Sequence, residues 1–159
     1  MFLAKKGPVD RQQLVNLRNL QIKATQTPWF IILDGDEIWP KDNLIQLIKA
    51  IEKAKPSTIA LVNRTKNCVG DLHHFLPETK GRYQIGPWKG HLNIRAIKNL
   101  PGLKVVGEYP DEAYVYQSKK LQDQPKKPGI CGYLVSAHHS FKTHWLVAQF
   151  KSYRPLKKI

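Results

Sequence analysis

The chain has 159 residues, 42% hydrophobic and 24% charged, which is the composition of one folded, water-soluble domain. Its 26 Lys and Arg residues against 12 Asp and Glu residues give a net charge of +14, which favours polyanionic partners. A transmembrane helix and a secretory signal are not expected, because no apolar run approaches the ~20 residues that span a bilayer and lysines interrupt the start of the chain. Cys68 and Cys131 form no paired motif, which predicts free thiols in a reducing cytoplasm.

The first predicted element is a helix over residues 10–25. Leu14 and Leu17 fall on one stripe of this helix. Asp10 is a suitable N-cap, and Pro28 ends the helical pattern.

Two short apolar runs are predicted to be buried strands. Trp29–Leu33 is continuous and apolar, as in a strand covered on both faces of a parallel sheet, and Ile59–Val62 has the same character. A helix between them begins at Pro40 and is closed by Pro56. Alternating helices and buried strands predict an α/β layered sheet with parallel strands.

Glycine and proline punctuate the second half, which predicts a mixed, partly antiparallel region. Short strands are expected at Leu92–Ile97 and Leu103–Val106. A loop is expected at Pro125–Gly129, a helix from Ser140 to about Tyr153, and a basic tail at Arg154–Ile159.

Half of the 12 acidic residues stand in two clusters, Asp34/Asp36/Glu37 and Glu108/Asp111/Glu112. The first cluster directly follows a predicted buried strand, and ligands of open α/β sheets bind at the carboxyl ends of strands. Two carboxylates spaced as in Asp34-Gly35-Asp36 suit Mg²⁺ or Mn²⁺. The alternative is an acidic turn that only caps the helix beginning near Pro40.

Residues 11–51 resemble the central signature of family 2 glycosyltransferases, which have the GT-A fold. The resemblance rests on Arg18-Asn19-Leu20-Gln21-Ile22-Lys23-Ala24 followed by Trp29–Pro40 with its Asp-x-Asp motif. Less specifically, His91–Arg95 and Gly107–Tyr114 resemble the acceptor-side segment of that family.

The resemblance implies a GT-A-like, Rossmann-like mixed sheet flanked by helices. The expected organisation is a partial glycosyltransferase domain over residues 1–139, followed by a C-terminal helix and basic tail over residues 140–159. The family's opening strands, which hold the nucleotide base, have no counterpart in the sequence. We therefore expect an N-terminally truncated domain that is inactive or poorly folded alone.

The resemblance also implies a nucleotide-diphosphate-sugar donor and a saccharide or lipid-linked acceptor. Asp34 and Asp36 would hold a divalent ion, Mn²⁺ or Mg²⁺, that bridges the diphosphate. Arg18 is the candidate for a phosphate contact, with an ordinary helix-face charge as the alternative. His138 is the best placed of the histidines His138, His139 and His144 to complete the metal site.

Transfer with inversion requires a carboxylate that deprotonates the acceptor hydroxyl. The second acidic cluster supplies three candidates, Glu112 first, Asp111 second and Glu108 third. A solvated turn around Pro110 is the alternative for this cluster. Trp88 is a candidate sugar-stacking platform, with buried aromatic packing the favoured role.

Two other functions compete with glycosyl transfer. Phosphatases of the haloacid dehalogenase type also carry Asp-x-Asp after a buried strand, although here a full helix precedes the motif. A basic nucleic-acid-binding module would account for the +14 charge, but the sequence has no helix-turn-helix, zinc or RNP-type motif, so no specific nucleic acid is expected. The predicted location is the cytoplasm, with peripheral contact to the inner face of the membrane left open.

Overall fold

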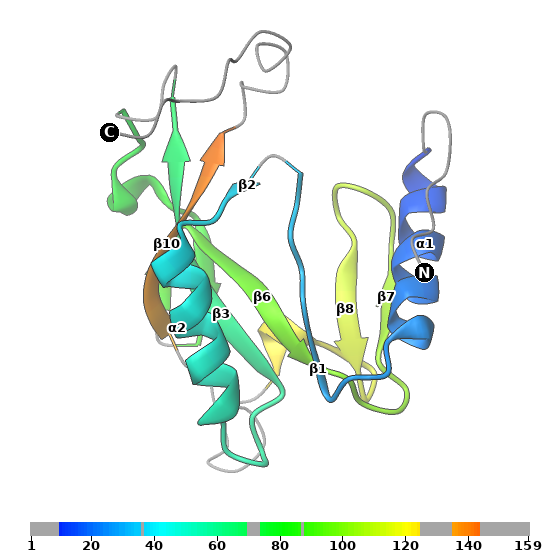
Figure 1. Cartoon of the computed structure of the whole chain (residues 1–159). Coiled ribbons are helices and arrows are strands. Elements are labelled where there is room, and N and C mark those ends of the chain that lie inside the picture. Colours follow the sequence, from blue (N-terminus) through cyan, green and yellow to red (C-terminus); the bar gives the residue numbers. More distant parts are fainter. Residues whose placement is uncertain (1–9, 36, 70–73, 87, 125–134, 144–159) are drawn as a thin grey trace, which may run out of the picture.

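The computed structural model describes residues 10–35, 37–69, 74–86, 88–124 and, for the backbone alone, 135–143. Within these ranges, two helices and three sheets make a mixed α/β fold (Figure 1). A five-stranded sheet has the order β1-β6-β3-β10-β2 and consists of β1 (Trp29–Ile31), β2 (Glu37–Ile38), β3 (Ala60–Cys68), β6 (Leu92–Lys98) and β10 (Val135–Thr143). The smaller sheets consist of β4 (Tyr83–Ile85) with β5 (Trp88–Gly90), and of β7 (Lys104–Val106), β8 (Ala113–Tyr116) and β9 (Lys119–Lys120). Two 3-10 turns are η1 (Glu78–Lys80) and η2 (Leu121–Asp123).

The helices begin and end close to where the local signals place them. Helix α1 (Arg11–Ala24) begins after Asp10, whose side chain accepts a hydrogen bond from the amide of Gln13. Helix α2 (Lys41–Glu52) begins after Pro40. Within the described part of the chain, neither helix is long and apolar enough to cross a membrane.

The two predicted buried strands run in the same direction but are not neighbours. The antiparallel strand β6 lies between β1 and β3, so that Ile97 stands opposite both Phe30 and Ala60. Among the described strands of this sheet, β3 and β10 form the one parallel pair. The two strands are therefore parallel in direction, as expected, but an antiparallel strand separates them and the sheet is mixed. The antiparallel pairing expected for the second half is confirmed.

The residues of the apolar run at β1 are apolar because both faces of the sheet are covered there. Such a run does not indicate the direction of the strand. Phe30 and Ile32 pack on the core beneath α1, and Trp29 and Ile31 pack on the core beneath α2. The strand ends at Ile31, earlier than predicted, and Leu33 is 58% exposed. Figure 1 shows α2 against the large sheet and α1 against β7 on the other side of β1.

A strand also replaces the beginning of the predicted C-terminal helix. Residues Ser140–Thr143 belong to β10, which pairs in parallel with β3, so a helix does not begin at Ser140. Long-range pairing with a strand some 75 residues earlier in the chain overrides the local pattern. The loop predicted at Pro125–Gly129 and the residues after Thr143 lie outside the described residues.

Candidate active site

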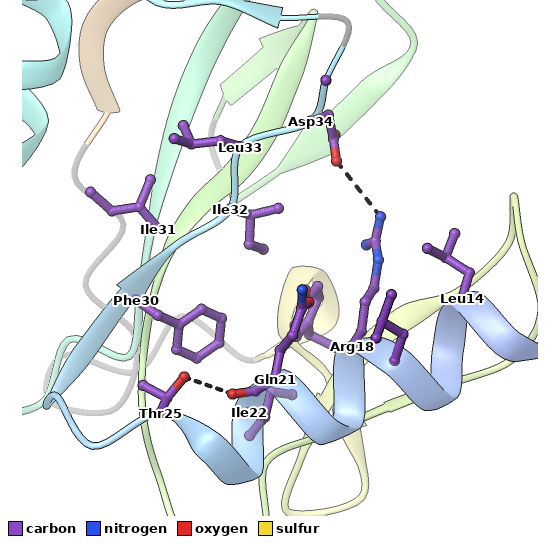
Figure 2. A pocket seen from close by; sticks show the side chains of 13 residues that line it. Leu14, Arg18, Gln21, Ile22, Thr25, Phe30, Ile31, Ile32, Leu33 and Asp34 are labelled. Carbon is purple, nitrogen blue, oxygen red and sulfur yellow. Dashed lines mark hydrogen bonds and ion pairs between the residues drawn. The ribbon is translucent and has the colours of Figure 1, made fainter. Parts of the chain in front are cut away.

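The position of α1 is fixed by a side chain that completes a sheet edge. The Asn19 amide donates to the carbonyl oxygen of Val105 at 2.9 Å, and its Oδ1 accepts from the Val105 amide at 2.8 Å. Asn19 thus satisfies both backbone groups of one β7 residue. The preceding residue, Arg18, is thereby directed across the gap between α1 and the end of β1 (Figure 2).

Asp34 meets two arginines just beyond the end of β1. The antiparallel pairing continues past the strand, because the Ile32 amide donates to the carbonyl oxygen of Arg95 at 2.8 Å. This pairing brings Asp34 Oδ2 to 2.9 Å from Arg95 Nη2. Asp34 Oδ1 lies 3.7 Å from Arg18 Nη2, a looser ion pair.

Arg95 is a buried cation that holds two carboxylates. Its side chain is 6% exposed, and the same Nη2 contacts both Asp34 and Glu37. The Glu37 side chain is completely buried and also accepts a hydrogen bond from Trp39 Nε1 at 3.2 Å. Arg95 on β6 therefore ties together the two ends of the segment that joins β1 to β2.

The second acidic cluster divides into two exposed members and one buried member. Glu108 and Asp111 lie exposed on a turn, which the Asp111 amide closes by donating to the Glu108 carbonyl at 2.7 Å. Gly107 permits the turn with a φ of +91°. Glu112 points the other way: its side chain is 9% exposed, and Oε1 lies 3.3 Å from Arg18 Nη1. Its Oε2 is buried and has no hydrogen-bond partner in the described part of the structure.

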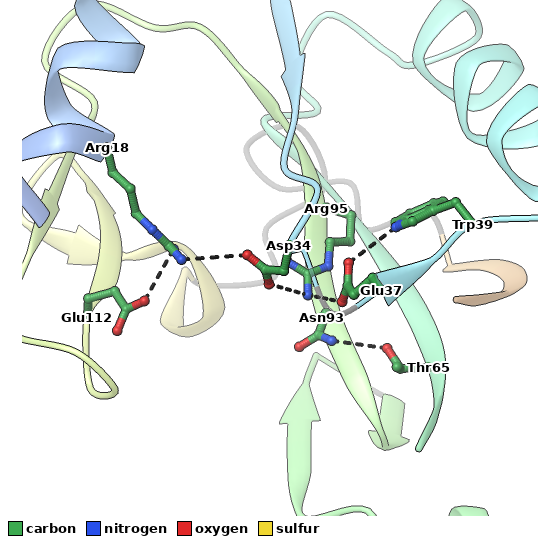
Figure 3. A network of polar contacts seen from close by, with 8 residues as sticks. All are labelled: Arg18, Asp34, Glu37, Trp39, Thr65, Asn93, Arg95 and Glu112. Carbon is green, nitrogen blue, oxygen red and sulfur yellow. Dashed lines mark hydrogen bonds and ion pairs between the residues drawn. The ribbon is translucent and has the colours of Figure 1, made fainter. Parts of the chain in front are cut away.

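These contacts form one chain of charged groups. It runs from Glu112 through Arg18 to Asp34, and from there through Arg95 to Glu37 (Figure 3). Three carboxylates face two guanidinium groups, so the cluster carries a formal charge of −1 within a strongly basic protein.

A cavity of about 420 Å³ opens beside this cluster, between α1 and β1. Its lining includes Arg18, Asp34, Gly35, Phe30 and Tyr114. Figure 2 shows the Arg18 side chain extending from α1 toward Asp34. Burial raises the pKa of the Tyr114 phenol above its ordinary value of 10.0, although the neighbouring Arg18 guanidinium opposes this change. Tyr114 is therefore a neutral hydrogen-bonding group at physiological pH.

The predicted metal ligands are described only in part. Asp34 offers a carboxylate at the cavity, whereas Asp36 and the His138 side chain lie outside the described residues. No group of three or more His, Cys, Asp or Glu side chains gathers as a metal site within the described ranges. The carboxylate oxygens of Asp34 are the donor type that a hard divalent ion prefers, and Oδ1 lies 3.7 Å from Arg18 Nη2 in a loose ion pair.

The remaining candidates from the sequence are Trp88 and two further histidines, His139 and His144. Trp88 packs on the buried cluster of Val62, Ile85 and Leu92, in agreement with the favoured packing role. His139 lies on β10 opposite Arg64 in the backbone register, and His144 falls outside the described residues.

Sequence reasoning assigned no role to Arg95, Glu37 or Tyr114. Arg95 had a detectable signal, because it is the one charged residue within the apolar strand run Leu92–Ile97. Such a residue must find partners when the strand is buried. Nothing in the sequence indicates that those partners are Asp34 and Glu37, which lie about 60 positions earlier.

The mixed α/β fold, with an acidic segment crossing the sheet end and a second buried carboxylate nearby, is that of a GT-A-like glycosyltransferase domain. The sequence profile of glycosyl transferase family 2 matches residues 9–118, and the chain belongs to this family. The family implies a nucleotide-sugar donor and an acceptor substrate. No curated protein matched the chain. The family assignment favours glycosyl transfer over the phosphatase and nucleic-acid-binding alternatives.

Proposed function

We propose that the chain transfers a sugar from a nucleotide-diphosphate sugar to an acceptor hydroxyl, with inversion at the anomeric carbon. The observation that carries the proposal is the burial of the Glu112 carboxylate and the contacts of its two oxygens. Its carboxylate is nine-tenths buried, one oxygen is fixed by Arg18, and the other has no hydrogen-bond partner among the described residues. A buried acceptor oxygen without a donor is suited to receive a proton from a bound hydroxyl group.

In the proposed reaction the acceptor hydroxyl gives its proton to Glu112 Oε2 as its oxygen attacks the anomeric carbon. The bond between this carbon and the diphosphate oxygen breaks, and the bonding electrons leave with the nucleoside diphosphate. Arg18 Nη1 lies 3.3 Å from Oε1 of the base and orients the carboxylate.

The cavity between α1 and β1 is the proposed donor site. Its volume of about 420 Å³ falls within the ~300–1,000 Å³ of small-molecule sites. Arg18 and Asp34 both line this cavity and lie 3.7 Å apart, and Arg18 also contacts the proposed base. A donor diphosphate beside Arg18 and Asp34 would place its sugar near Glu112.

The charge of the site supports a requirement for a divalent cation, Mn²⁺ or Mg²⁺. The cluster has a formal charge of −1, so a diphosphate entering it is repelled unless a cation binds as well. We propose that Asp34 and Asp36 hold this ion, and His138 is retained as a further proposed ligand. When bound, the ion neutralises charge on the leaving diphosphate.

The proposed acceptor is a saccharide or a lipid-linked saccharide, and the proposed location is the cytoplasm. The two cysteines of the sequence, Cys68 and Cys131, form no paired motif, which supports a reducing compartment. Contact with the inner face of a membrane is a separate proposal, for which the basic charge of the chain is the support.

The test compares three single variants of the second acidic cluster, E108Q, D111N and E112Q. Release of nucleoside diphosphate is measured from UDP-, GDP- and dTDP-sugars in the presence of Mn²⁺ and simple glycoside acceptors. We expect kcat to fall about 100-fold or more in E112Q alone, the usual contribution of a general base. Binding of the donor nucleotide, measured by calorimetry, should persist in E112Q.

Each outcome separates the candidates. Loss of activity in D111N or E108Q with normal activity in E112Q would assign the base to the exposed turn and refute the role of Glu112. For the metal, donor binding should disappear with a chelator and in D34N and D36A. Donor binding that is indifferent to Mn²⁺ would overturn the metal proposal without affecting the role of Glu112.

A further inference from the structure

Three exposed apolar residues lie together at the end of β3. Val69 is 52% exposed, and Phe75 and Leu76 are 46% and 42% exposed. Backbone hydrogen bonds join the two segments that carry them, because the Val69 amide donates to the His74 carbonyl at 2.8 Å and the Leu76 amide donates to the Asn67 carbonyl at 2.9 Å. Val69, Phe75 and Leu76 therefore form one surface, which we call the apolar patch, and are not scattered single residues.

The apolar patch presents side chains on both faces of this strand pair. Phe75 stands opposite Cys68, and successive residues of a strand point to opposite faces, so Leu76 points away from the face of Phe75. Lys66 lies two positions before Cys68 and shares the face of Phe75, and its Nζ is 4.4 Å from the centre of the Phe75 ring. A flat partner surface covers one face of a strand pair, whereas the headgroup and acyl boundary of a bilayer surrounds both.

Basic residues surround the apolar patch. The described segments 64–69 and 74–82 hold four basic residues and one acidic residue, namely Arg64, Lys66, Lys80, Arg82 and Glu78. Glu78 forms an ion pair with Arg64, and Lys80 and Arg82 are exposed. A surface with this excess of positive charge attracts anionic lipid headgroups.

The hollow beside the apolar patch is too small to make it the wall of a substrate pocket. This hollow has a volume of about 130 Å³, and Phe75, Leu76 and Pro77 contribute to its lining. Small-molecule sites have volumes of ~300–1,000 Å³. Figure 1 shows the end of β3 on the side of the large sheet away from α1, so the apolar patch is separate from the proposed donor cavity.

We propose that the apolar patch docks the chain on an anionic lipid surface. Its side chains enter the boundary between headgroups and acyl chains, while Lys66, Lys80 and Arg82 contact the lipid phosphates. The Lys66 ammonium stays at the level of the headgroups while the Phe75 ring beside it lies deeper. The inference gives the membrane contact proposed above a location, and it assigns no role to Glu112 or to catalysis.

The experiment is flotation of the full chain with vesicles of phosphatidylcholine alone and of phosphatidylcholine mixed with an equal amount of phosphatidylglycerol. We expect the chain to float with the anionic vesicles and to remain in solution with the neutral ones. The variant F75W reports insertion, because lipids brominated on the acyl chains should quench its fluorescence more than that of the parent. Absence of binding to the anionic vesicles, or quenching equal to that of the parent, overturns the inference.

Serine variants test whether the apolar patch carries the binding. F75S/L76S replaces two half-exposed side chains and should weaken binding to the anionic vesicles about tenfold or more, the effect of burying one full apolar side chain. The matched control is I45S/I48S, which replaces two side chains of α2 that are 37% and 43% exposed. The control should bind as the parent does. Equal losses in the two variants would refute the role of the apolar patch.

Glutamine variants separate local attraction from the charge of the whole chain. K80Q/R82Q and K104Q/K119Q each remove two positive charges from exposed positions. We expect K80Q/R82Q to weaken binding about 25-fold, at about fivefold for each charge near the lipid surface. K104Q/K119Q changes the sheet of β7, β8 and β9 and should lose much less. Equal losses would show attraction by net charge alone and overturn the assignment to this surface.

Two measurements distinguish this inference from its neighbours. Analytical ultracentrifugation without vesicles tests a second copy as the occupant, since a dimer that F75S/L76S dissociates would assign the apolar patch to self-association and refute lipid docking. Calorimetry of donor nucleotide binding tests the proposed function separately. Flotation that fails while the donor binds rejects the docking surface alone, and flotation without donor binding rejects the glycosyl-transfer proposal alone.

Discussion

Replacing Arg95 by methionine tests the central element of the site. The substitution removes the cation but keeps a long side chain in β6. Glu37, whose side chain has no solvent exposure, then loses the Arg95 cation and remains a buried carboxylate beside Trp39. Breaking a buried ion pair by removing one partner costs about 3–5 kcal/mol. That is a large part of the ~5–15 kcal/mol that stabilises a typical domain, and it corresponds to a fall in Tm of roughly 6–20 °C.

The assay is urea unfolding of the full chain followed by tryptophan fluorescence. The matched control is R64M, which removes the Arg64–Glu78 ion pair from a surface where the two side chains are 29% and 58% exposed. Exposed pairs contribute about 0–1 kcal/mol, so R64M should unfold close to the parent. The two variants delete the same group with the same replacement and differ in the burial of the partner.

A double variant distinguishes a lost pair from poor packing of methionine. In R95M/E37L both charges are absent, so most of the stability lost in R95M should return. The reasoning is refuted if R95M is within about 1 kcal/mol of R64M. It is also refuted if the double variant is no more stable than R95M, because the penalty would then not come from the carboxylate.

Two further predictions concern α1 and the cavity wall. N19A should lose about 1–3 kcal/mol of unfolding free energy, because two hydrogen bonds to Val105 disappear. The control N16A, at an exposed position of the same helix, should lose little. Equal losses in the two variants would contradict the anchoring role of Asn19. Burial raises the pKa of Tyr114, so the unfolded chain releases this proton first and stability should fall as the pH rises above 10.0, by at most about 1.4 kcal/mol per pH unit. Y114F should abolish that part of the alkaline loss and Y83F should keep it, as measured by urea unfolding between pH 9 and 11.

The parts of the fold that the sequence predicts correctly are those set by neighbouring residues. Asp10 and Pro40 mark helix starts because capping and a fixed φ act within one turn. Strand direction depends instead on which segment arrives next to which. Nothing near Trp29 indicates that Leu92–Lys98 inserts beside it, and nothing near Ser140 indicates that β3 will take it as a strand partner.

In the candidate site, too, local signals could be predicted from the sequence and long-range contacts could not. Asp34 could be found from the sequence because it follows an apolar run, a local signal for the end of a covered strand. The distinction between Glu112 and its neighbours Glu108 and Asp111 could be ranked but not established, because it depends on which side of one turn faces Arg18. A turn of four residues reverses direction within a few ångströms, and sequence spacing does not record which side is buried.

The charge of the whole chain gives the wrong sign for the site. A net charge of +14 suggests a surface that attracts phosphates, yet the cluster around Arg95 is net negative. Salt affects these two charges differently. The charge of the surface acts over a Debye length of about 8 Å and is screened by salt, whereas the buried cluster is screened much less. We therefore expect the association rate of a nucleotide sugar to fall with rising salt, while its requirement for Mn²⁺ stays the same. A metal requirement that weakened in parallel with the association rate would assign the ion to the exposed surface and away from Asp34.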